Sequence, residues 1–208
     1  MTFRLSEPRL TGIFGGSFDP PHIGHSGIVT SFWNTIPQAE ELLVIPNCVS
    51  PLKNGKHASS ENILQMLDAQ FSKIPKTKIL DIELRKKGTS YTYETLLELK
   101  ELYPERNFLL LVGEDNYCEF QKWRNWENIL GLIRSLLVFR RVSEYIPKNP
   151  HLNSFEEKIL FLNNPIIPAA STDLRNVLPA AVAKNRKPIA LSQAVWDKIL
   201  ELKAYSEG

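Results

Sequence analysis

Short apolar segments alternate with longer amphipathic segments along the 208 residues of this chain. The apolar segments predict strands at residues 10–14, 42–45, 108–112, 136–139 and 158–162, and the alternation of apolar and polar residues at 79–84 predicts a further strand. The segment 108–112 is wholly apolar, which is typical of a central parallel strand buried on both faces. Several segments between the strands carry apolar residues three and four positions apart, the spacing of a helix with one buried face.

These intervening segments predict helices, several of them preceded by a serine or threonine that can cap the free backbone N–H groups. The predicted helices are residues 24–34, one capped by Ser59 or Ser60 that runs to Phe71, one capped by Thr92 and ended by Pro104, a short one around Trp123 and Trp126, one capped by Ser171, and one from Ser192 to Tyr205. Residues 141–157 contain two prolines and mixed charges, which favours a long exposed loop.

The order of these elements predicts an α/β fold with a Rossmann-like, doubly wound, mostly parallel sheet and helices on both faces. The length suits one domain, so we expect a single domain over residues 1–208, with the C-terminal helical part, about residues 171–208, packed on it. Ligands of such sheets bind at the carboxyl ends of the strands. Gly15, Gly113 and the loop 163–171 would lie there.

Composition and charge narrow the choice of partners and compartment. Lys and Arg number 25 against 23 Asp and Glu, and this small excess does not favour nucleic acid or a membrane surface as a partner. Neither an apolar leader nor a run of about 18 apolar residues occurs, so we expect a soluble cytoplasmic protein. Cys48 and Cys118 form no CxxC pair, which fits buried thiols in a reducing compartment. The oligomeric state, including a homo-oligomer, stays open.

The segment GGSFDPPHIGH directly follows the first predicted strand. Gly15 and Gly16 allow the backbone to approach a ligand closely, and the two prolines fix the turn into the next helix. Such a helix start points unpaired N–H groups at one spot, where a phosphate can bind. His22 and His25 lie on one face of this helix and can donate hydrogen bonds to phosphate oxygens, together with Ser17.

Other interpretations of these residues stay open from the residues alone. A histidine in such a position can be a core side chain or a helix cap. Asp19, His22 and His25 can also supply three ligands to a metal ion, although no further cluster of histidines or carboxylates lies near them, and we expect no metal site built from side chains. The chain has no GxxxxGK[ST] or GxGxxG loop, so a kinase-type or dinucleotide-type loop is not indicated.

The same segment resembles the signature of the nucleotidyltransferase superfamily, whose HxGH motif is here His22-Ile23-Gly24-His25. From about residue 11 to the C-terminus the chain most resembles the bacterial nicotinate-mononucleotide adenylyltransferases of that superfamily. The further segments that carry the resemblance are IPNCVSPLK (45–53), DIELRKKGTSYT (81–92), GED (113–115), Trp123 with Trp126, and STDLR (171–175). The chain departs from the family pattern at Ala170, where a second hydroxyl residue is usual, and at Leu52, where a histidine is common.

The resemblance implies catalytic roles for His22 and His25, with His22 on the α-phosphate of ATP and His25 on the leaving pyrophosphate. It implies further contacts to ATP from Gly15, Gly16, Ser17, Phe18, Lys53, Asp115, Ser171, Thr172 and Arg175. It implies contacts to nicotinate mononucleotide from Ser90, Tyr91, Thr92 and Trp123. Seen alone, Lys53 is equally a solvated surface lysine, Ser171 the cap of a surface helix, and Tyr91 and Trp123 core residues.

The implied reaction is transfer of AMP from ATP to nicotinate mononucleotide, which yields nicotinate adenine dinucleotide and pyrophosphate for NAD biosynthesis. Both reactants are already ionised, so positioning and charge stabilisation can carry the reaction without a base. Mg²⁺ is the implied cofactor, held mainly by phosphate oxygens and water, and Asp115 would face a ribose hydroxyl or hydrated Mg²⁺. Two alternatives stay open: the same transfer to another acceptor such as phosphopantetheine, and a non-catalytic nucleotide-binding module.

Overall fold

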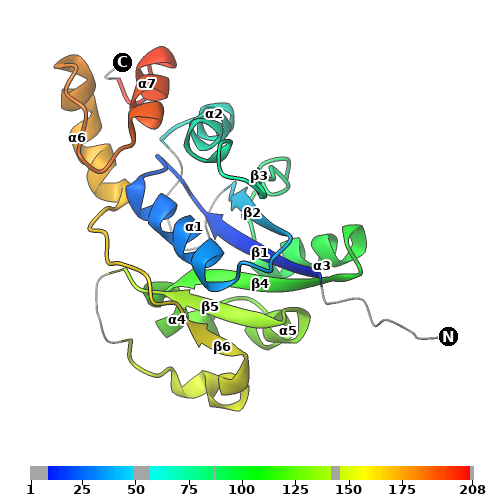
Figure 1. Cartoon of the computed structure of the whole chain (residues 1–208). Helices are drawn as coiled ribbons and strands as arrows, with labels where there is room; N and C mark the ends of the chain where they lie inside the picture. The colour runs from blue at the N-terminus through cyan, green and yellow to red at the C-terminus, as the bar shows by residue number, and fades with distance from the viewer. Residues whose placement is uncertain (1–8, 49–56, 87, 142–145, 207–208) are drawn as a thin grey trace.

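The computed structural model describes residues 9–48, 57–86, 88–141 and 146–206. Within them, six parallel strands form one sheet in the order β3-β2-β1-β4-β5-β6 (Figure 1). The strands are β1 (Arg9–Gly16), β2 (Glu41–Pro46), β3 (Thr77–Ile79), β4 (Arg106–Gly113), β5 (Ser135–Phe139) and β6 (Ile159–Phe161). The strand order reverses between β1 and β4, and this reversal opens a crevice at the carboxyl ends of the strands. The predicted α/β, doubly wound, Rossmann-like fold is confirmed.

Helices cover both faces of this sheet. The helices are α1 (Ile23–Thr35), α2 (Ser60–Phe71), α3 (Thr92–Leu102), α4 (Glu114–Cys118), α5 (Trp126–Leu132), α6 (Ser171–Ala183) and α7 (Gln193–Glu201), with 3-10 helices η1 (Phe120–Lys122) and η2 (Pro150–Lys158). Alternate strand residues face opposite sides. Phe14 of β1 packs in the core with α1, α2, α6 and α7, whereas Ile13 packs in the core with α3, α4 and α5.

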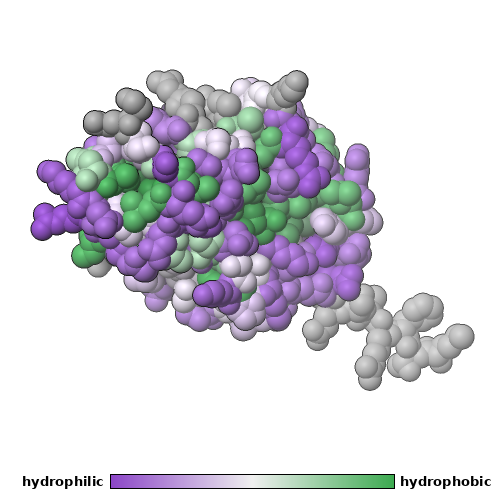
Figure 2. Space-filling view, turned by 90° about the horizontal axis from the view of Figure 1, so that it is seen from above, coloured by the Kyte–Doolittle hydropathy of each residue, from purple (hydrophilic) through white to green (hydrophobic). Residues whose placement is uncertain are grey.

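The outer surface is mainly hydrophilic on the face seen from above in Figure 2, with apolar residues exposed in separate patches between polar ones. Helix α7 packs on α2, so the C-terminal helices extend the core on the α1 side of the sheet. None of the helices in the described ranges is long and apolar enough to span a bilayer.

The predicted strand at residues 79–84 is wrong beyond its first residue. Strand β3 ends at Ile79, and after Leu80 donates one hydrogen bond to the Val44 carbonyl the chain turns away from the sheet. Glu83 is buried in this turn, where its carboxylate accepts a hydrogen bond from the Thr95 hydroxyl at 2.7 Å. The alternating pattern therefore arises from a turn that packs against α3 and not from an extended strand.

The predicted caps of two helices are also wrong by one residue. Thr92 and Ser171 are the first residues of α3 and α6, and the capping positions belong to Tyr91 and Ala170, which have extended backbones and make no side-chain cap hydrogen bond. In contrast, the predicted caps of α2 and α7 are confirmed. The hydroxyls of Ser59 and Ser192 accept hydrogen bonds from the N–H groups of Asn62 (3.1 Å) and Val195 (3.3 Å).

Two further boundaries differ from the prediction. Helix α7 ends at Glu201 and does not reach Tyr205, because Lys203 and Tyr205 adopt left-handed backbone angles (φ 51° and 60°). The predicted loop 141–157 is wrong in its second half, where η2 begins at Pro150, as proline favours at a helix start. Leu152 of η2 is buried in the core, which ties this segment to the sheet. Residues 142–145 lie outside the described ranges.

Candidate active site

A cavity of about 430 Å³ opens where the carboxyl ends of β1, β4 and β5 meet the starts of α1 and α6. The predicted site residues within the described ranges all line it, namely Gly15, Gly16, Ser17, Phe18, His22, His25, Ser90, Tyr91, Thr92, Asp115, Trp123, Ser171, Thr172 and Arg175. Lys53, also predicted to contact ATP, lies outside the described residues. The fold thus gathers segments from five regions of the sequence at one place.

The two motif histidines stack on each other at the start of α1. Their ring centroids lie 3.8 Å apart with 27° between the planes, and the backbone N–H of His22 donates to Nδ1 of His25 at 3.1 Å. Because Nδ1 of His25 accepts, the neutral ring carries its proton on Nε2, as a donor. The glycine between them leaves room for this stack, since a Cβ on Gly24 would lie 3.0 Å from the His22 ring, closer than most real Cβ contacts.

His22 is almost fully buried, with 4 % of its surface exposed. Burial, and secondarily the positive charge of Arg141, lowers the pKa of His22 from 6.5 to about 4. The imidazole is therefore neutral near pH 7 in the free protein. A neutral ring donates one hydrogen bond, and an anionic phosphate placed beside it would raise its pKa again.

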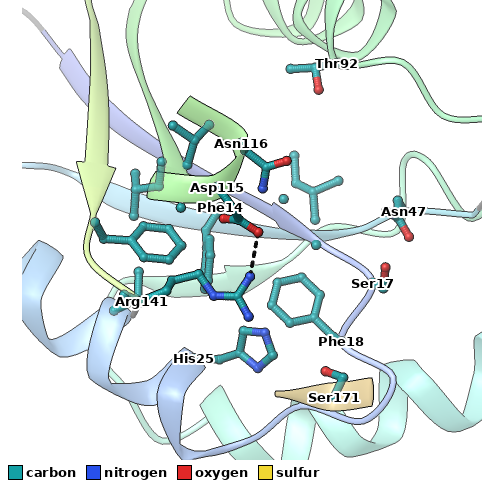
Figure 3. A pocket seen from close by; sticks show the side chains of 18 of the residues that line it. Phe14, Ser17, Phe18, His25, Asn47, Thr92, Asp115, Asn116, Arg141 and Ser171 are labelled. Atoms are coloured by element: carbon teal, nitrogen blue, oxygen red, sulfur yellow. Dashed lines mark hydrogen bonds and ion pairs between the residues drawn. The ribbon is translucent and has the colours of Figure 1, made fainter. Parts of the chain in front are cut away.

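Phe18 packs its ring against the ring of His25. Its ring is 1 % exposed, meets Phe14 edge to face at 5.3 Å and lies 4.8 Å from the His25 ring (Figure 3). Its backbone is left-handed, with φ 48°. Phe18 therefore contributes to the site by fixing the position of the imidazole as well as by lining the cavity.

The carboxylate of Asp19 has its hydrogen-bond partners in other parts of the chain than the two imidazoles. The carboxylate accepts hydrogen bonds from the backbone N–H groups of His57 (2.8 Å) and Ala58 (3.3 Å) and from the hydroxyl of Tyr205. No group of three His, Cys, Asp or Glu side chains in the described ranges is arranged to hold a metal ion. The alternative in which Asp19, His22 and His25 form a metal centre therefore has no support from their geometry.

The start of α6 docks on the same loop from the other side. The hydroxyl of Ser171 donates to the Pro20 carbonyl at 2.9 Å, and Arg175 donates to the Asp19 carbonyl at 2.7 Å and to the Thr172 hydroxyl at 3.0 Å. Two helix starts thus meet at one loop, as expected from the sequence. In the free protein, however, Ser171 and Arg175 donate to the loop itself, so they hold it in place.

The residues assigned to the second nucleotide lie across the cavity, where Thr92 faces His25 from the opposite wall (Figure 3). The Ser90 hydroxyl accepts a hydrogen bond from the Cys48 N–H at 3.0 Å. Arg124 lies 4.8 Å over the ring of Tyr91, the N-cap residue of α3, and is paired with Glu94 at 3.1 Å. Trp123 packs on Phe120 at 4.9 Å, half-buried. This end of the cavity combines aromatic surface with positive charge.

Comparisons with known proteins identify the family. A family model described as cytidylyltransferase-like matches residues 13–177. A relative from Leptospira borgpetersenii is 50% identical over 98% of this chain and 100% of its own length, and its name is "Probable nicotinate-nucleotide adenylyltransferase". A relative of the same name from Leptospira interrogans is 51% identical over 98% of this chain and 100% of its own length. The chain belongs to the nicotinate-nucleotide adenylyltransferase family.

Solved structures agree with this adenylyltransferase fold. The Plasmodium falciparum nicotinic acid mononucleotide adenylyltransferase complexed with NaAD superposes with a TM-score of 0.75, covering 95% of this chain and 97% of that chain. The two sequences are 21% identical, so the comparison bears on the fold. The family expected from the HxGH segment is confirmed, and this chain is a nucleotidyltransferase.

Some residues that line this adenylyltransferase cavity were not predicted from the sequence. Arg141 reaches the cavity and donates to the Asp115 carboxylate at 2.9 Å (Figure 3). Asn47 and Asn116 line the cavity as well. Arg141 follows β5 and Asn47 follows β2, so the rule that ligands bind at the carboxyl ends of parallel strands pointed to both positions. Arg141 belongs to no motif, and from the segment IPNCVSPLK, which contains Asn47, only Lys53 was assigned a contact.

Proposed function

We propose that this protein transfers AMP from ATP to nicotinate mononucleotide and releases pyrophosphate, forming nicotinate adenine dinucleotide. The observation that carries this proposal is the meeting of the His22 and His25 pair with the Ser90 to Thr92 segment and Trp123 on one cavity. A phosphate-binding helix start and a half-buried aromatic surface are what a nucleoside triphosphate and a pyridine nucleotide require. The names of the Leptospira relatives support the same substrate.

In the proposed reaction, an oxygen of the mononucleotide 5′-phosphate attacks the α-phosphorus of ATP. The bond from this phosphorus to the bridging oxygen breaks, and pyrophosphate leaves with that electron pair. The nucleophile is already an anion, so the protein has no proton to remove. Its contribution is to align the two phosphates and to stabilise the charge of the transition state, through His22 at the α-phosphate and Nε2–H of His25 at the leaving group.

We propose Mg²⁺ as the cofactor. Mg²⁺ prefers oxygen ligands and keeps several waters, so it would bind mainly through the ATP phosphates and supply neutralising charge there. The carboxylate of Asp115 fits such an assignment, because its side chain is 55% exposed at the edge of the cavity. From this position Asp115 would accept from a metal-bound water or from a ribose hydroxyl.

We also propose that the pyridine end of the cavity prefers nicotinate to its amide. The first N–H groups of α3 have no partner within the helix, and Tyr91 supplies no side-chain cap for them. The guanidinium of Arg124 lies over Tyr91 and is paired with Glu94 at 3.1 Å, an exposed ion pair in which a substrate carboxylate would replace Glu94. A carboxylate gains from both the helix dipole and this guanidinium, whereas a neutral carboxamide gains much less.

The test is to incubate the protein with Mg-ATP and one acceptor at a time, and to measure the release of pyrophosphate. The acceptors are nicotinate mononucleotide, nicotinamide mononucleotide and phosphopantetheine. Fastest release with nicotinate mononucleotide is expected. Release with phosphopantetheine alone would establish the alternative acceptor, and binding of ATP without release for any acceptor would favour the non-catalytic module.

A further inference from the structure

Arg141 enters the cavity from the end of β5, at a position that no motif assigns. Strands β4 and β5 are paired in register from Leu109 with Ser135 to Gly113 with Phe139, so the residues after them lie side by side at the carboxyl edge of the sheet. Arg141 and Asp115 form their ion pair there, at 2.9 Å. Gly113 leaves room for this pair, because a Cβ at that position would lie 2.5 Å from Asp115 Oδ1 and 2.8 Å from Arg141 Cδ.

The other cationic side chains that line the cavity donate hydrogen bonds to backbone carbonyls or to glutamate side chains of the protein. Arg175 donates to the Asp19 carbonyl, Arg140 to the Asn164 carbonyl, Arg124 to Glu94 and Lys122 to Glu119. Arg141 differs from them because its partner Asp115 offers a carboxylate that itself lines the cavity. Asp19 and Asn164 accept through their backbone carbonyls, and Glu94 and Glu119 are not among the lining residues. The side chains of this pair are 36% and 55% exposed, and an ion pair so open to water is weak and easily exchanged.

The Arg141 side chain points toward the place where a phosphate would bind at the start of α1. Figure 3 shows its guanidinium between Asp115 and His25, facing the space above the motif helix. Its positive charge contributes to the lowered pKa of His22, so its field reaches the buried imidazole at the start of α1. An anion bound at the start of α1 would therefore lie within reach of this guanidinium.

We propose that Arg141 is a phosphate-binding residue of the nucleotide site, which exchanges the Asp115 carboxylate for a phosphate of ATP when the nucleotide binds. The proposal rests on the proposed function, in which Asp115 turns to the ribose or to metal-bound water. A guanidinium is suited to the exchange, because it pairs with carboxylate and phosphate oxygens through the same two parallel N–H groups. One residue thus couples occupation of the ribose position to binding of the phosphates.

Calorimetric titration with inorganic tripolyphosphate tests this proposal, because that anion carries the phosphates of ATP without the ribose. Arg141→Ala is expected to weaken binding about tenfold or more, and Arg141→Lys to restore part of it by keeping the charge. Asp115→Asn is expected to tighten binding, since it releases Arg141. The matched control is Arg134→Ala, which removes an exposed arginine at the opposite end of β5 and should bind like the wild type.

The double variant Arg141→Ala with Asp115→Asn separates the proposal from a general charge effect. If Arg141 binds phosphate, the gain from Asp115→Asn disappears in the absence of Arg141, whereas a gain that persists would overturn the proposal. Equal weakening by Arg141→Ala and Asp115→Asn would show a purely structural ion pair and would overturn it too. Tripolyphosphate binding is read without turnover, so a wild-type protein that binds it but transfers no AMP would refute the proposed function and not the role of Arg141.

Discussion

The hydroxyl of Tyr205 donates a hydrogen bond to the carboxylate of Asp19, which joins the segment after α7 to the loop of the motif histidines. Asp19 is 2% exposed, and the same carboxylate binds the N–H groups of His57 and Ala58. Arg175 holds the carbonyl of Asp19. Burial and the neighbouring carboxylate raise the pKa of Tyr205, so its hydroxyl stays a donor at working pH. Hydrogen bonds from three distant parts of the chain, Tyr205, residues 57–58 and Arg175, therefore hold this loop in place.

Tyr205→Phe removes the hydrogen bond from the Tyr205 hydroxyl to the Asp19 carboxylate. A hydrogen bond to a charged group contributes about 1.5–3 kcal/mol, so the free energy of unfolding should fall by that amount in a urea titration. Asp19→Asn and the double variant complete a mutant cycle. A strong contact predicts that the second substitution costs much less in the presence of the first. Strictly additive losses would show that the two side chains do not stabilise each other.

The buried His22 predicts how stability depends on pH. The unfolded chain protonates this imidazole below pH 6.5, whereas the folded protein does so only near pH 4, so stability is lost as the pH falls through this interval. The shift corresponds to a loss of about 3 kcal/mol. In His22→Asn this loss is absent, and the unfolding free energies of variant and wild type should converge, or cross, between pH 7 and pH 4. Parallel curves in guanidinium titrations would contradict the shifted pKa.

The sheet and the motif helix could be predicted because their signals are local. Residues 108–112 are apolar at every position, and β4 extends over them, while the Gly-rich segment is followed by α1 as expected. The error at residues 79–84 has another origin. Glu83 looked like the outward residue of a strand, yet it is buried through its hydrogen bond to Thr95, a contact set by the packing of α3.

In the candidate site, too, residues with a local sequence signal were predicted and residues placed by tertiary packing were not. Motif residues were found because each side chain and its spacing are unusual, as for the two histidines three positions apart. Arg141 lies in a segment that was predicted to be a loop, and only the pairing of β5 with β4 brings it beside Asp115. The hydrogen bond between Tyr205 and Asp19 joins residues 186 positions apart, and no periodic pattern in the sequence indicates it. Contacts of this kind depend on the finished fold.

Gly24 and Gly131 offer a comparison of two helical glycines. A Cβ on Gly24 would lie 3.0 Å from the His22 ring, so Gly24→Ala should push the imidazole by a few tenths of an ångström and lower turnover about tenfold. Gly131 in α5 has nothing within 4 Å of such a Cβ. Gly131→Ala should leave turnover unchanged and raise the free energy of unfolding by about 0.5–1 kcal/mol. Normal turnover in Gly24→Ala would show that the position of His22 is not critical.

His25→Ala tests the proposed role of the second imidazole. In the proposed reaction its Nε2–H would face the charge that develops on the leaving pyrophosphate, and loss of such a donor costs about 100-fold or more in turnover. The KM for nicotinate mononucleotide should stay close to that of the wild type, because the assigned acceptor residues lie across the cavity. Initial rates of pyrophosphate release at saturating Mg-ATP measure both quantities.

The control for this variant is His151→Ala, which removes an exposed histidine at the start of η2, outside the cavity. It should retain wild-type turnover and KM, so that any loss in His25→Ala is specific to the site. The ring of His25 also packs on Phe18, so unfolding curves are needed for both variants. If His25→Ala is folded and turns over like His151→Ala, His25 has no part in the reaction. A rise in the KM for nicotinate mononucleotide with unchanged turnover would instead place His25 in ground-state binding of the acceptor.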